Sequence, residues 1–386
     1  MIDRLLPNAR TDYLDVDTRE LAPMLDTLYR RDESAAALVE AIHRTRGKAR
    51  AQFERALEHG IETVTDPLPE VVAFFQTVDE IPSFIDADLV AEGVTAARRI
   101  DFLTWAFAIA TLDGLAATYN PNVALALQAN MRTFTNPSER FIGTASYGAE
   151  IFASGYGRFA PATLTASRLR VMHESIALKL TNNGDWDVAE YGLPISQYDI
   201  VAATYILVPC VVFAAQSYGY RFSPREWDGI VALTAMLGYR HGAPASMLPR
   251  TKEEMERGLY LILRSNSALS ALEATTKVLD ASINGDYDGV PWPVLAAIRH
   301  LLISYSRDLI GDPLCEASGI PNTPVRYLLK PVHAAIKVEN MLWQYIPPFR
   351  PIVRAAHGAV YDRMFSALDR ITPPAADRYP PAAATA

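Results

Sequence analysis

Residues 136–180 read NPSERFIGTASYGAEIFASGYGRFAPATLTASRLRVMHESIALKL, and this stretch decides the fold. In its second half, apolar residues recur at helical spacing, which predicts an amphipathic helix. We expect His173 to point into an apolar interior, where a buried imidazole needs a partner. The residues that share its predicted stripe are Leu169, Met172, Ile176, Ala177 and Leu180.

The first half of the stretch predicts a second helix, with Arg140 and Thr144 four residues apart on one face. Gly143 and Gly148 leave room for a flat ligand, such as a haem, to approach this helix. Simpler interpretations exist. A lone histidine on an apolar face is more often a core residue bonded to a carbonyl than a metal ligand, and the other two residues alone would pass as a surface pair.

Composition narrows the class of protein. A chain of 386 residues, half of them hydrophobic, can bury a large core. Its two cysteines are too few for a disulfide framework, which fits a reducing compartment. A cysteine ligand for haem, Cys210 or Cys315, is a weaker alternative, because Cys210 lies in the apolar run YILVPCVVF. The net charge of −8 argues against a nucleic-acid partner.

Two segments bear on membranes and targeting. The first residues, MIDRLLPNARTDYLD, include acids and no long apolar run, so we expect no secretory signal and a cytoplasmic protein. The most apolar segment, residues 200–215, falls short of the ~20 residues that cross a bilayer. We expect it to be a buried central helix, kinked near Pro209, and we expect no membrane span.

Every strong periodic pattern is helical, and no strand pattern bounded by turns occurs. We expect a helical extension over residues 1–80, a main helical domain over 81–371 that begins near an N-cap at Asp86, and a disordered proline- and alanine-rich tail over 372–386. Besides the two helices described above, helices are expected at residues 18–31, 34–60, 66–79, 88–119, 200–215, 224–237, 252–264, 266–283, 294–309, 323–345 and 351–371.

A series of short motifs also occurs in a definite order: IPSFID at 81–86 followed by Gly93, YNP at 119–121, Arg140 with Thr144, LRVMH at 169–173, YGLPISQYD at 191–199, Thr204, MLG at 236–238 and MLP at 247–249. In this order and spacing the motifs resemble those of the latex-clearing protein (rubber oxygenase) and mycophenolate side-chain-cleaving oxygenase family. The resemblance covers residues 81–249. It implies an all-α fold, with a globin-like helical core around a b-type haem and additional helices wrapped outside.

The resemblance also implies roles for single residues. His173 corresponds to the axial ligand of the haem iron, and Arg140 and Thr144 correspond to a catalytic polar pair over the open face. Arg140 and Arg170 are the implied cofactor contacts. A neutral imidazole suits iron. A cation with a hydroxyl could polarise dioxygen or anchor a haem propionate, and the sequence leaves open which of these Arg140 does.

The chain departs from the family pattern at several positions. Rubber-cleaving members carry an acidic residue on the helix before the arginine, whereas residues 114–138 contain none, and Gln128 is the nearest polar candidate. Gly143 stands where a lysine can cover the iron. Two further departures are Ser196 in place of an asparagine and Glu174 in place of a small residue. We therefore expect no activity on rubber and a smaller hydrophobic substrate.

Three functions remain open from the sequence. The leading one is a haem-dependent oxygenase that uses dioxygen on a hydrophobic, unsaturated small molecule, by cleavage of a carbon–carbon double bond or a related oxygenation. The second keeps the haem but performs peroxidase-like, hydroxylating or rearranging chemistry. The third is a non-enzymatic module that binds haem or a hydrophobic ligand. Should His173 not be the ligand, His241 and His333 are the next candidates. Neither the substrate nor the oligomeric state follows from the sequence.

Overall fold

The computed structural model describes residues 18–102, 104–106, 108, 122–123, 125–126, 137–154, 156–184, 186–265, 291–317 and 319–371. Within these residues every regular element is a helix and no strand occurs. The expected all-α class is therefore confirmed. The helix expected at residues 266–283, the tail at 372–386, and residues 109–119 of the helix expected over 88–119 lie outside the described residues.

The N-terminal part contains short helices: α2 (Thr18–Leu25), the 3₁₀ turn Asp26–Tyr29, α3 (Glu33–Arg44), α4 (Lys48–His59) and α5 (Pro69–Asp79). The single helix expected over residues 34–60 is wrong, because the chain breaks between α3 and α4. Arg46 has a φ of 47° and Gly47 a φ of 100°, and this left-handed backbone cannot continue a right-handed helix. At the start of α3, Asp32 is the N-cap and accepts a hydrogen bond from the backbone N–H of Ala35.

The next helix, α6 (Ala87–Ala97), begins as expected at Asp86, whose side chain accepts hydrogen bonds from the N–H groups of Asp88 and Leu89. The long helix expected over residues 88–119 is corrected, because α6 ends at Ala97. Asp101 then caps the start of the next helical segment, because its carboxylate accepts a hydrogen bond from the N–H of Thr104 at 2.9 Å. A side chain that caps a new helix competes with continuation of the old one.

The central helix is present as expected and spans Gln197–Ser217. It consists of α13 (Gln197–Tyr205), a π turn at Ile206–Cys210 and α14 (Val211–Ser217). Because Pro209 has no N–H to donate, the wider π turn absorbs the irregularity that was expected as a kink. The helix is longer than expected and matches a membrane span by length and composition, but most of it is buried inside the protein, as in a core helix.

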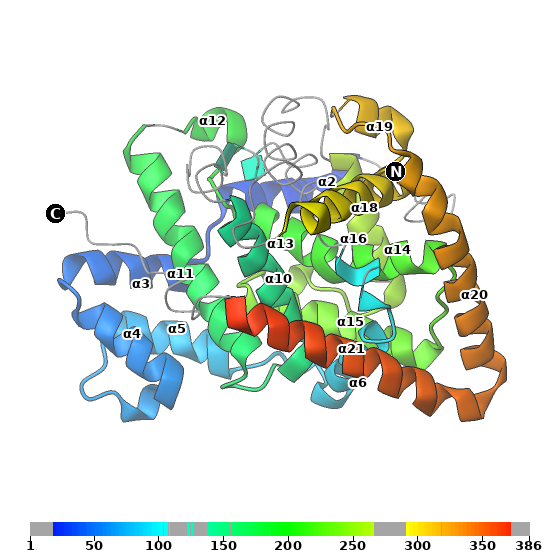
Figure 1. Ribbon diagram of the computed structural model, residues 1–386. Coiled ribbons are helices and arrows are strands. Elements are labelled where there is room, and N and C mark those ends of the chain that lie inside the picture. The colour runs from blue at the N-terminus through cyan, green and yellow to red at the C-terminus, as the bar shows by residue number, and fades with distance from the viewer. Residues whose placement is uncertain are drawn as a thin grey trace.

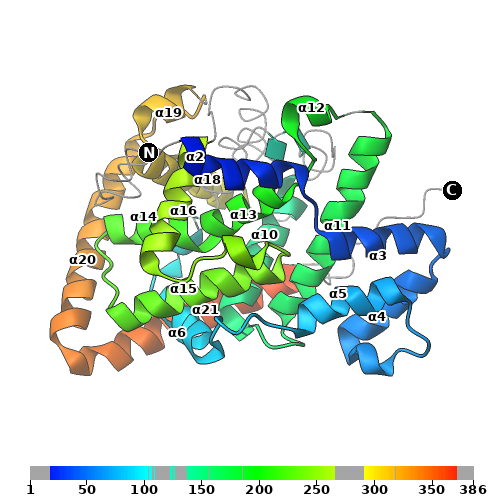
Figure 2. The same ribbon diagram turned by 180° about the vertical axis from the view of Figure 1, so that it is seen from behind.

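The remaining helices surround this centre. They are α10 (Pro137–Ser154), α11 (Pro161–Asn182), α12 (Val188–Tyr191), α15 (Pro224–Arg240), α16 (Lys252–Ser265), α18 (Trp292–Ile310), α19 (Asp312–Ala317), α20 (Leu329–Tyr345) and α21 (Arg350–Ile371), with 3₁₀ turns at Ile61–Thr63, Ala245–Met247, Pro324–Leu328 and Pro347–Phe349. Figure 1 shows α3, α4 and α5 at one side of the molecule and α20 at the opposite side, and Figure 2 shows the same order from behind.

Two apolar clusters hold these helices together. The larger includes residues of α6, α13, α14, α15 and α16. The smaller joins α3, α4 and α5 to one face of α11, through Val171, Leu164 and Leu178. The helices α6 and α15 cross with their backbones in contact: a Cβ on Gly93 would lie 2.1 Å from the carbonyl oxygen of Gly229. Arg240, the last residue of α15, and His241, which follows it, are both buried.

Candidate active site

His173 lies in the middle of α11, on the stripe that the sequence predicts, but that stripe is not the most buried one. Leu169, Met172, His173 and Ile176 are half-buried, whereas Arg170 and Glu174 are fully buried. The His173 stripe packs against apolar clusters through Leu169 and Ile176, as expected, but it is less completely buried than the face that carries Arg170 and Glu174. An apolar stripe that stays half-accessible suits contact with a hydrophobic ligand.

The environment of His173 keeps its imidazole neutral. Burial lowers the pKa of His173 to about 4, and the carboxylate of Asp32 offsets part of this effect. Among the residues that the structure describes, His173 has neither a hydrogen-bond partner nor an ion-pair partner. A neutral imidazole retains a lone pair on one ring nitrogen, which is the form that ligates a metal.

A second histidine, His241, lies close enough to His173 for His173 to lower the pKa of His241. It follows directly after α15, and its backbone N–H still bonds to the carbonyl of Leu237 at 3.0 Å. Burial, then the proximity of His173 and of Arg170, lowers the pKa of His241 to about 3. Its Nε2 is buried and has no hydrogen-bond partner in the described part of the chain. The structure therefore brings together two neutral imidazoles from α11 and from the end of α15.

The helix α10 reaches the same place through Tyr147. The ring of Tyr147 packs against the imidazole of His241, with 5.3 Å between ring centroids. Tyr147 is buried, and Thr144, three residues before it on the same helix face, is half-buried. Arg140 lies one turn earlier, within α10, but its side chain is outside the described residues. The face of α10 that carries Thr144 thus continues, through Tyr147, to His241.

Tyr147 was not assigned a role from the sequence, and His241 was named only as an alternative ligand to His173. Tyr147 was detectable, because it follows Thr144 at helical spacing. His241 carried no such signal, since only the packing of α15 brings the residue after its C-terminus towards α11. The backbone there is held by the buried Arg240, which donates hydrogen bonds to the carbonyls of Val78 and Tyr156.

Gly148 has a different role from the one expected. A Cβ at this position would lie 2.8 Å from two ring carbons of the Trp105 indole, so Gly148 makes room for that side chain and not for a flat ligand. The helix α10 thereby packs closely on the segment that carries Trp105. Gly143, by contrast, is buried and carries no side chain that could ligate a metal.

Arg170, which the sequence predicts to contact the cofactor, binds several protein groups through its guanidinium. It donates to the Asp32 carboxylate from Nε at 2.6 Å and from Nη2 at 3.0 Å. It donates further to Ser34 at 2.8 Å and to Thr77 at 3.0 Å, and it lies 4.6 Å from the ring centroid of Phe74. These contacts leave the guanidinium little capacity for a propionate.

Two departures from the family pattern have structural explanations. Glu174 is buried, accepts a hydrogen bond from the backbone N–H of Asp32 at 3.0 Å and pairs with Arg31 at 3.4 Å. Burial raises the pKa of Glu174 to about 7. Ser196 caps α13: its hydroxyl accepts from the N–H of Asp199, and the Asp199 carboxylate accepts from the Ser196 N–H at 2.7 Å. Both residues therefore hold segments that surround the histidines.

The residues present suit a haem better than a metal held by protein ligands alone. Within the described part of the chain, no group of three histidine, cysteine or acidic residues could hold a metal ion. A haem brings four nitrogen ligands of its own and needs one imidazole from the protein. Cys210 and Cys315 are both buried, and burial raises the pKa of the Cys210 thiol well above its usual range, which disfavours a thiolate ligand.

Comparisons with known proteins agree with this architecture. Residues 98–338, more than half of the chain, match the family model described as ER-bound oxygenase mpaB/B'/Rubber oxygenase, catalytic domain. The fold is similar to that of a solved structure, the latex clearing protein LCP in the closed state, with a TM-score of 0.59 and 18% sequence identity over 87% of this chain and 91% of that one. A search of curated proteins found no match. The chain therefore belongs to the mpaB and rubber oxygenase family, which makes it an enzyme of the oxygenase kind.

Proposed function

We propose that this protein is a haem-dependent oxygenase in which His173 is the axial ligand of the iron. The observation that carries the proposal is the pair of neutral imidazoles, half-buried His173 and buried His241, next to the Thr144 face of α10. His173 is neutral and has no hydrogen-bond partner in the described part of the chain, and ligation of iron gives such a nitrogen a function.

Of the two histidines, His173 is the better ligand. It is half-buried and lies between half-buried apolar residues of α11, whereas His241 is almost fully buried. A macrocycle needs an accessible imidazole with apolar side chains beside it. Leu169, Met172 and Ile176 provide that surface on the same helix face.

The chain itself contributes the following chemistry. Haem bound at His173 supplies an iron centre that activates dioxygen. His173 holds its position on a rigid helix, and the apolar stripe of α11 excludes water and favours a hydrophobic, unsaturated small molecule as substrate. The Thr144 hydroxyl and Arg140, one turn before it on α10, would donate hydrogen bonds. Their acceptor would be either dioxygen or a haem propionate.

The first experiment tests the ligand. The purified protein is loaded with haem, and its haem content and Soret spectrum are compared with those of His173→Ala, His241→Ala and His333→Ala. His333 is the matched control, because it lies in a separate cluster, stacked on Tyr218 with 4.1 Å between ring centroids. We expect only His173→Ala to lose haem or its axial ligand signature. A variant at position 173 with unchanged haem content and spectrum would refute the assignment.

The second experiment tests the reaction. Haem-loaded protein is incubated under ¹⁸O₂ with unsaturated hydrophobic compounds, and the products are analysed for labelled carbonyl groups. Incorporation of label distinguishes an oxygenase from peroxidase-like or rearranging chemistry and from a binding module. Thr144→Val, which keeps the side-chain shape but removes the hydroxyl, should lower turnover with little loss of stability. Full activity of that variant would remove Thr144 from the mechanism.

A further inference from the structure

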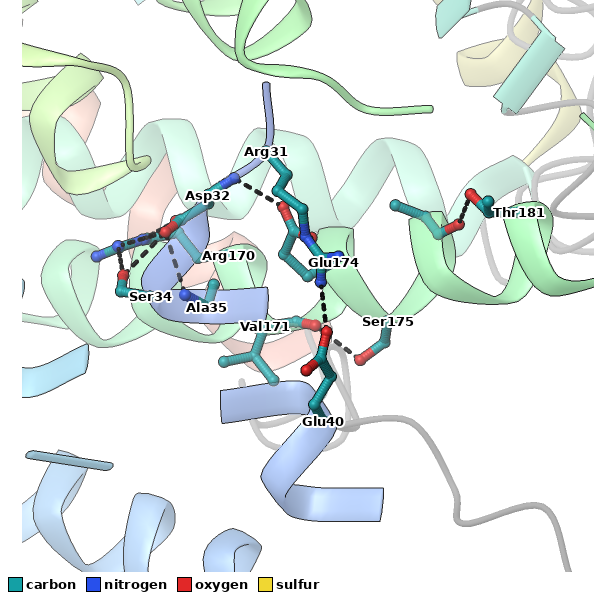
Figure 3. Close-up of polar contacts among 11 residues, drawn as sticks. Arg31, Asp32, Ser34, Ala35, Glu40, Arg170, Val171, Glu174, Ser175 and Thr181 are labelled. Carbon is teal, nitrogen blue, oxygen red and sulfur yellow. Dashed lines mark hydrogen bonds and ion pairs between the residues drawn. The ribbon is translucent and has the colours of Figure 1, made fainter. Parts of the chain in front are cut away.

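Asp32, the N-cap of α3, is the centre of a buried polar cluster that the proposed reaction does not use (Figure 3). Its carboxylate receives two hydrogen bonds from Arg170, at 2.6 Å and 3.0 Å, and one from the N–H of Ala35 at 3.1 Å. The side chains of Asp32 and Arg170 are 11% and 4% exposed. A bidentate pair with this burial is rigid and directional, unlike an exposed ion pair.

Asp32 holds α11 at two points on either side of His173. Its carboxylate binds Arg170, and its backbone N–H donates to the carboxylate of Glu174 at 3.0 Å. Arg170 and Glu174 are four residues apart and so lie on one face of α11, with His173 between them in sequence. Two contacts on one helix turn fix the rotation of that turn, and with it the direction of the His173 side chain.

The same carboxylate lies against the turn that carries His241. Gly242 has a φ of 87°, and a Cβ there would lie 2.3 Å from Oδ2 of Asp32 and 2.9 Å from Nε of Arg170. Only a glycine permits both this backbone conformation and this approach. The ion pair therefore contacts the residue that directly follows His241.

The segment that carries Asp32 is itself anchored. The carbonyl of Leu28 accepts from the N–H of Leu193 at 2.8 Å, and the carbonyl of Arg30 accepts from the N–H of Gln197 at 2.9 Å. Together with the bond from Asp32 to Glu174, these contacts tie residues 28–32 to both α11 and α13. Asp32 is thus held by the backbone on one side and by Arg170 on the other.

We propose that Asp32 is a positioning residue, which locks the His173 turn of α11 against the turn that carries His241. Its effect on haem rests on the proposed function. Its effect on the histidines does not, because the contacts exist in the protein without haem.

The haem-free protein gives the decisive test, by NMR of the seven histidines after selective ¹³C labelling of their rings. We expect Asp32→Asn to shift the resonances of both His173 and His241 and to leave the other five in place. Asp86→Asn is the matched control, since Asp86 is also a helix N-cap but lies on α6. A folded Asp32→Asn protein in which neither resonance moves, or only that of His173, would overturn the proposal.

A second pair of variants covers the case in which Asp32→Asn does not fold. Gly242→Ala directs a methyl group at the ion pair, whereas Gly184→Ala has a similar φ of 73° and meets no atom within 4 Å. Both suffer backbone strain, so only the difference between them reports on Asp32. We expect Gly242→Ala to move both histidine resonances and Gly184→Ala to move neither. Equal spectra for the two variants would overturn the proposal.

Haem titration then tests whether the positioning role of Asp32 matters for function. We expect Asp32→Asn to weaken haem binding by about 10–100-fold, the usual effect of losing a group that orients a metal ligand, and to shift the iron–histidine stretching frequency. If the unmodified protein binds no haem, the proposed function fails, and the histidine resonances still decide the role of Asp32. If Asp32→Asn leaves both the haem affinity and the histidine resonances unchanged, the positioning role of Asp32 is refuted and the proposed function is not.

Discussion

Gly93→Ala should destabilise the protein through one backbone contact between α6 and α15. The added Cβ would lie 2.1 Å from the carbonyl oxygen of Gly229 and 2.6 Å from its carbonyl carbon, whereas ordinary contacts begin at 3.4 Å. The helices must therefore separate by about 1 Å along their crossing, which forfeits a quarter to a half of the dispersion energy there. With the usual cost of overpacking, we expect a loss of ~3 kcal/mol in the free energy of unfolding, after the small gain in helix propensity.

The assay is urea denaturation followed by circular dichroism, with Gly358→Ala as the matched control. Gly358 also lies inside a helix, α21, but a Cβ there meets nothing within 4 Å. That variant should be more stable than the parent by about 0.5–1 kcal/mol, because alanine is the better helix former. If Gly93→Ala were as stable as Gly358→Ala, the close crossing would not exist as described.

A double-mutant cycle refines the result. Gly229→Ala should also destabilise, because its Cβ would lie 2.5 Å from the backbone nitrogen of Gly93. The Gly93→Ala, Gly229→Ala double variant should cost less than the two single changes together, since the helices have already moved apart. Strict additivity would contradict a shared contact.

Three further predictions concern the iron site, the substrate and pH. Because Gly143 offers no side chain as a ligand, the iron of the haem-loaded protein should be five-coordinate or carry only water. It should therefore bind added imidazole or carbon monoxide. A resting spectrum typical of two nitrogen ligands from the protein would contradict this. The protein should not cleave latex or squalene, because residues 114–138 contain no acidic residue or histidine to act as a base. A positioned base typically raises the rate by about 10²–10⁴-fold. Carbonyl-ended fragments from the parent protein would refute this prediction, and fragments from Gln128→Glu alone would support it. Burial alone would lower the pKa of His357, but its hydrogen bond and ion pair with Glu339 raise it above the ordinary 6.5. The stability that this pair contributes is therefore full below pH 6.5 and is lost as the pH rises through the raised value. The stability difference between the parent and His357→Gln should shrink over that range, and a difference that does not change with pH would argue against the pair.

Local helical signals were predictable from the sequence, whereas helix ends set by distant contacts were not. The helix of His173, the N-cap at Asp86 and the central helix with Pro209 all follow from periodicity and capping residues, which act within a few positions. The break after Ala97 follows from Asp101, whose backbone N–H donates to the hydroxyl of Tyr220 at 2.8 Å. A partner more than a hundred residues away leaves no local trace in the sequence.

The candidate site divides in the same way. His173 and the Thr144 face of α10 were identified from helical spacing and from the order of motifs. The proximity of His241 to His173, and of Tyr147 to His241, was not predicted, because it depends on how α10, α11 and α15 pack. The ion pair of Arg170 was not predicted for the same reason: a motif shows that an arginine is present, but only the fold shows that Asp32 binds it.

The sequence by itself determined that this protein is all-helical, which family it resembles, and which helix carries the histidine proposed to bind iron, because these properties depend on periodicity and on residues close together in the chain. The tertiary structure alone decided which side chains meet. Gly93 and Gly229 let α6 and α15 cross in backbone contact, and His241, which follows α15, lies near His173. Asp32 and Gly242 bring the turns of both histidines against one ion pair. Such meetings require residues more than sixty positions apart to pack at van der Waals distance, which no short-range pattern encodes.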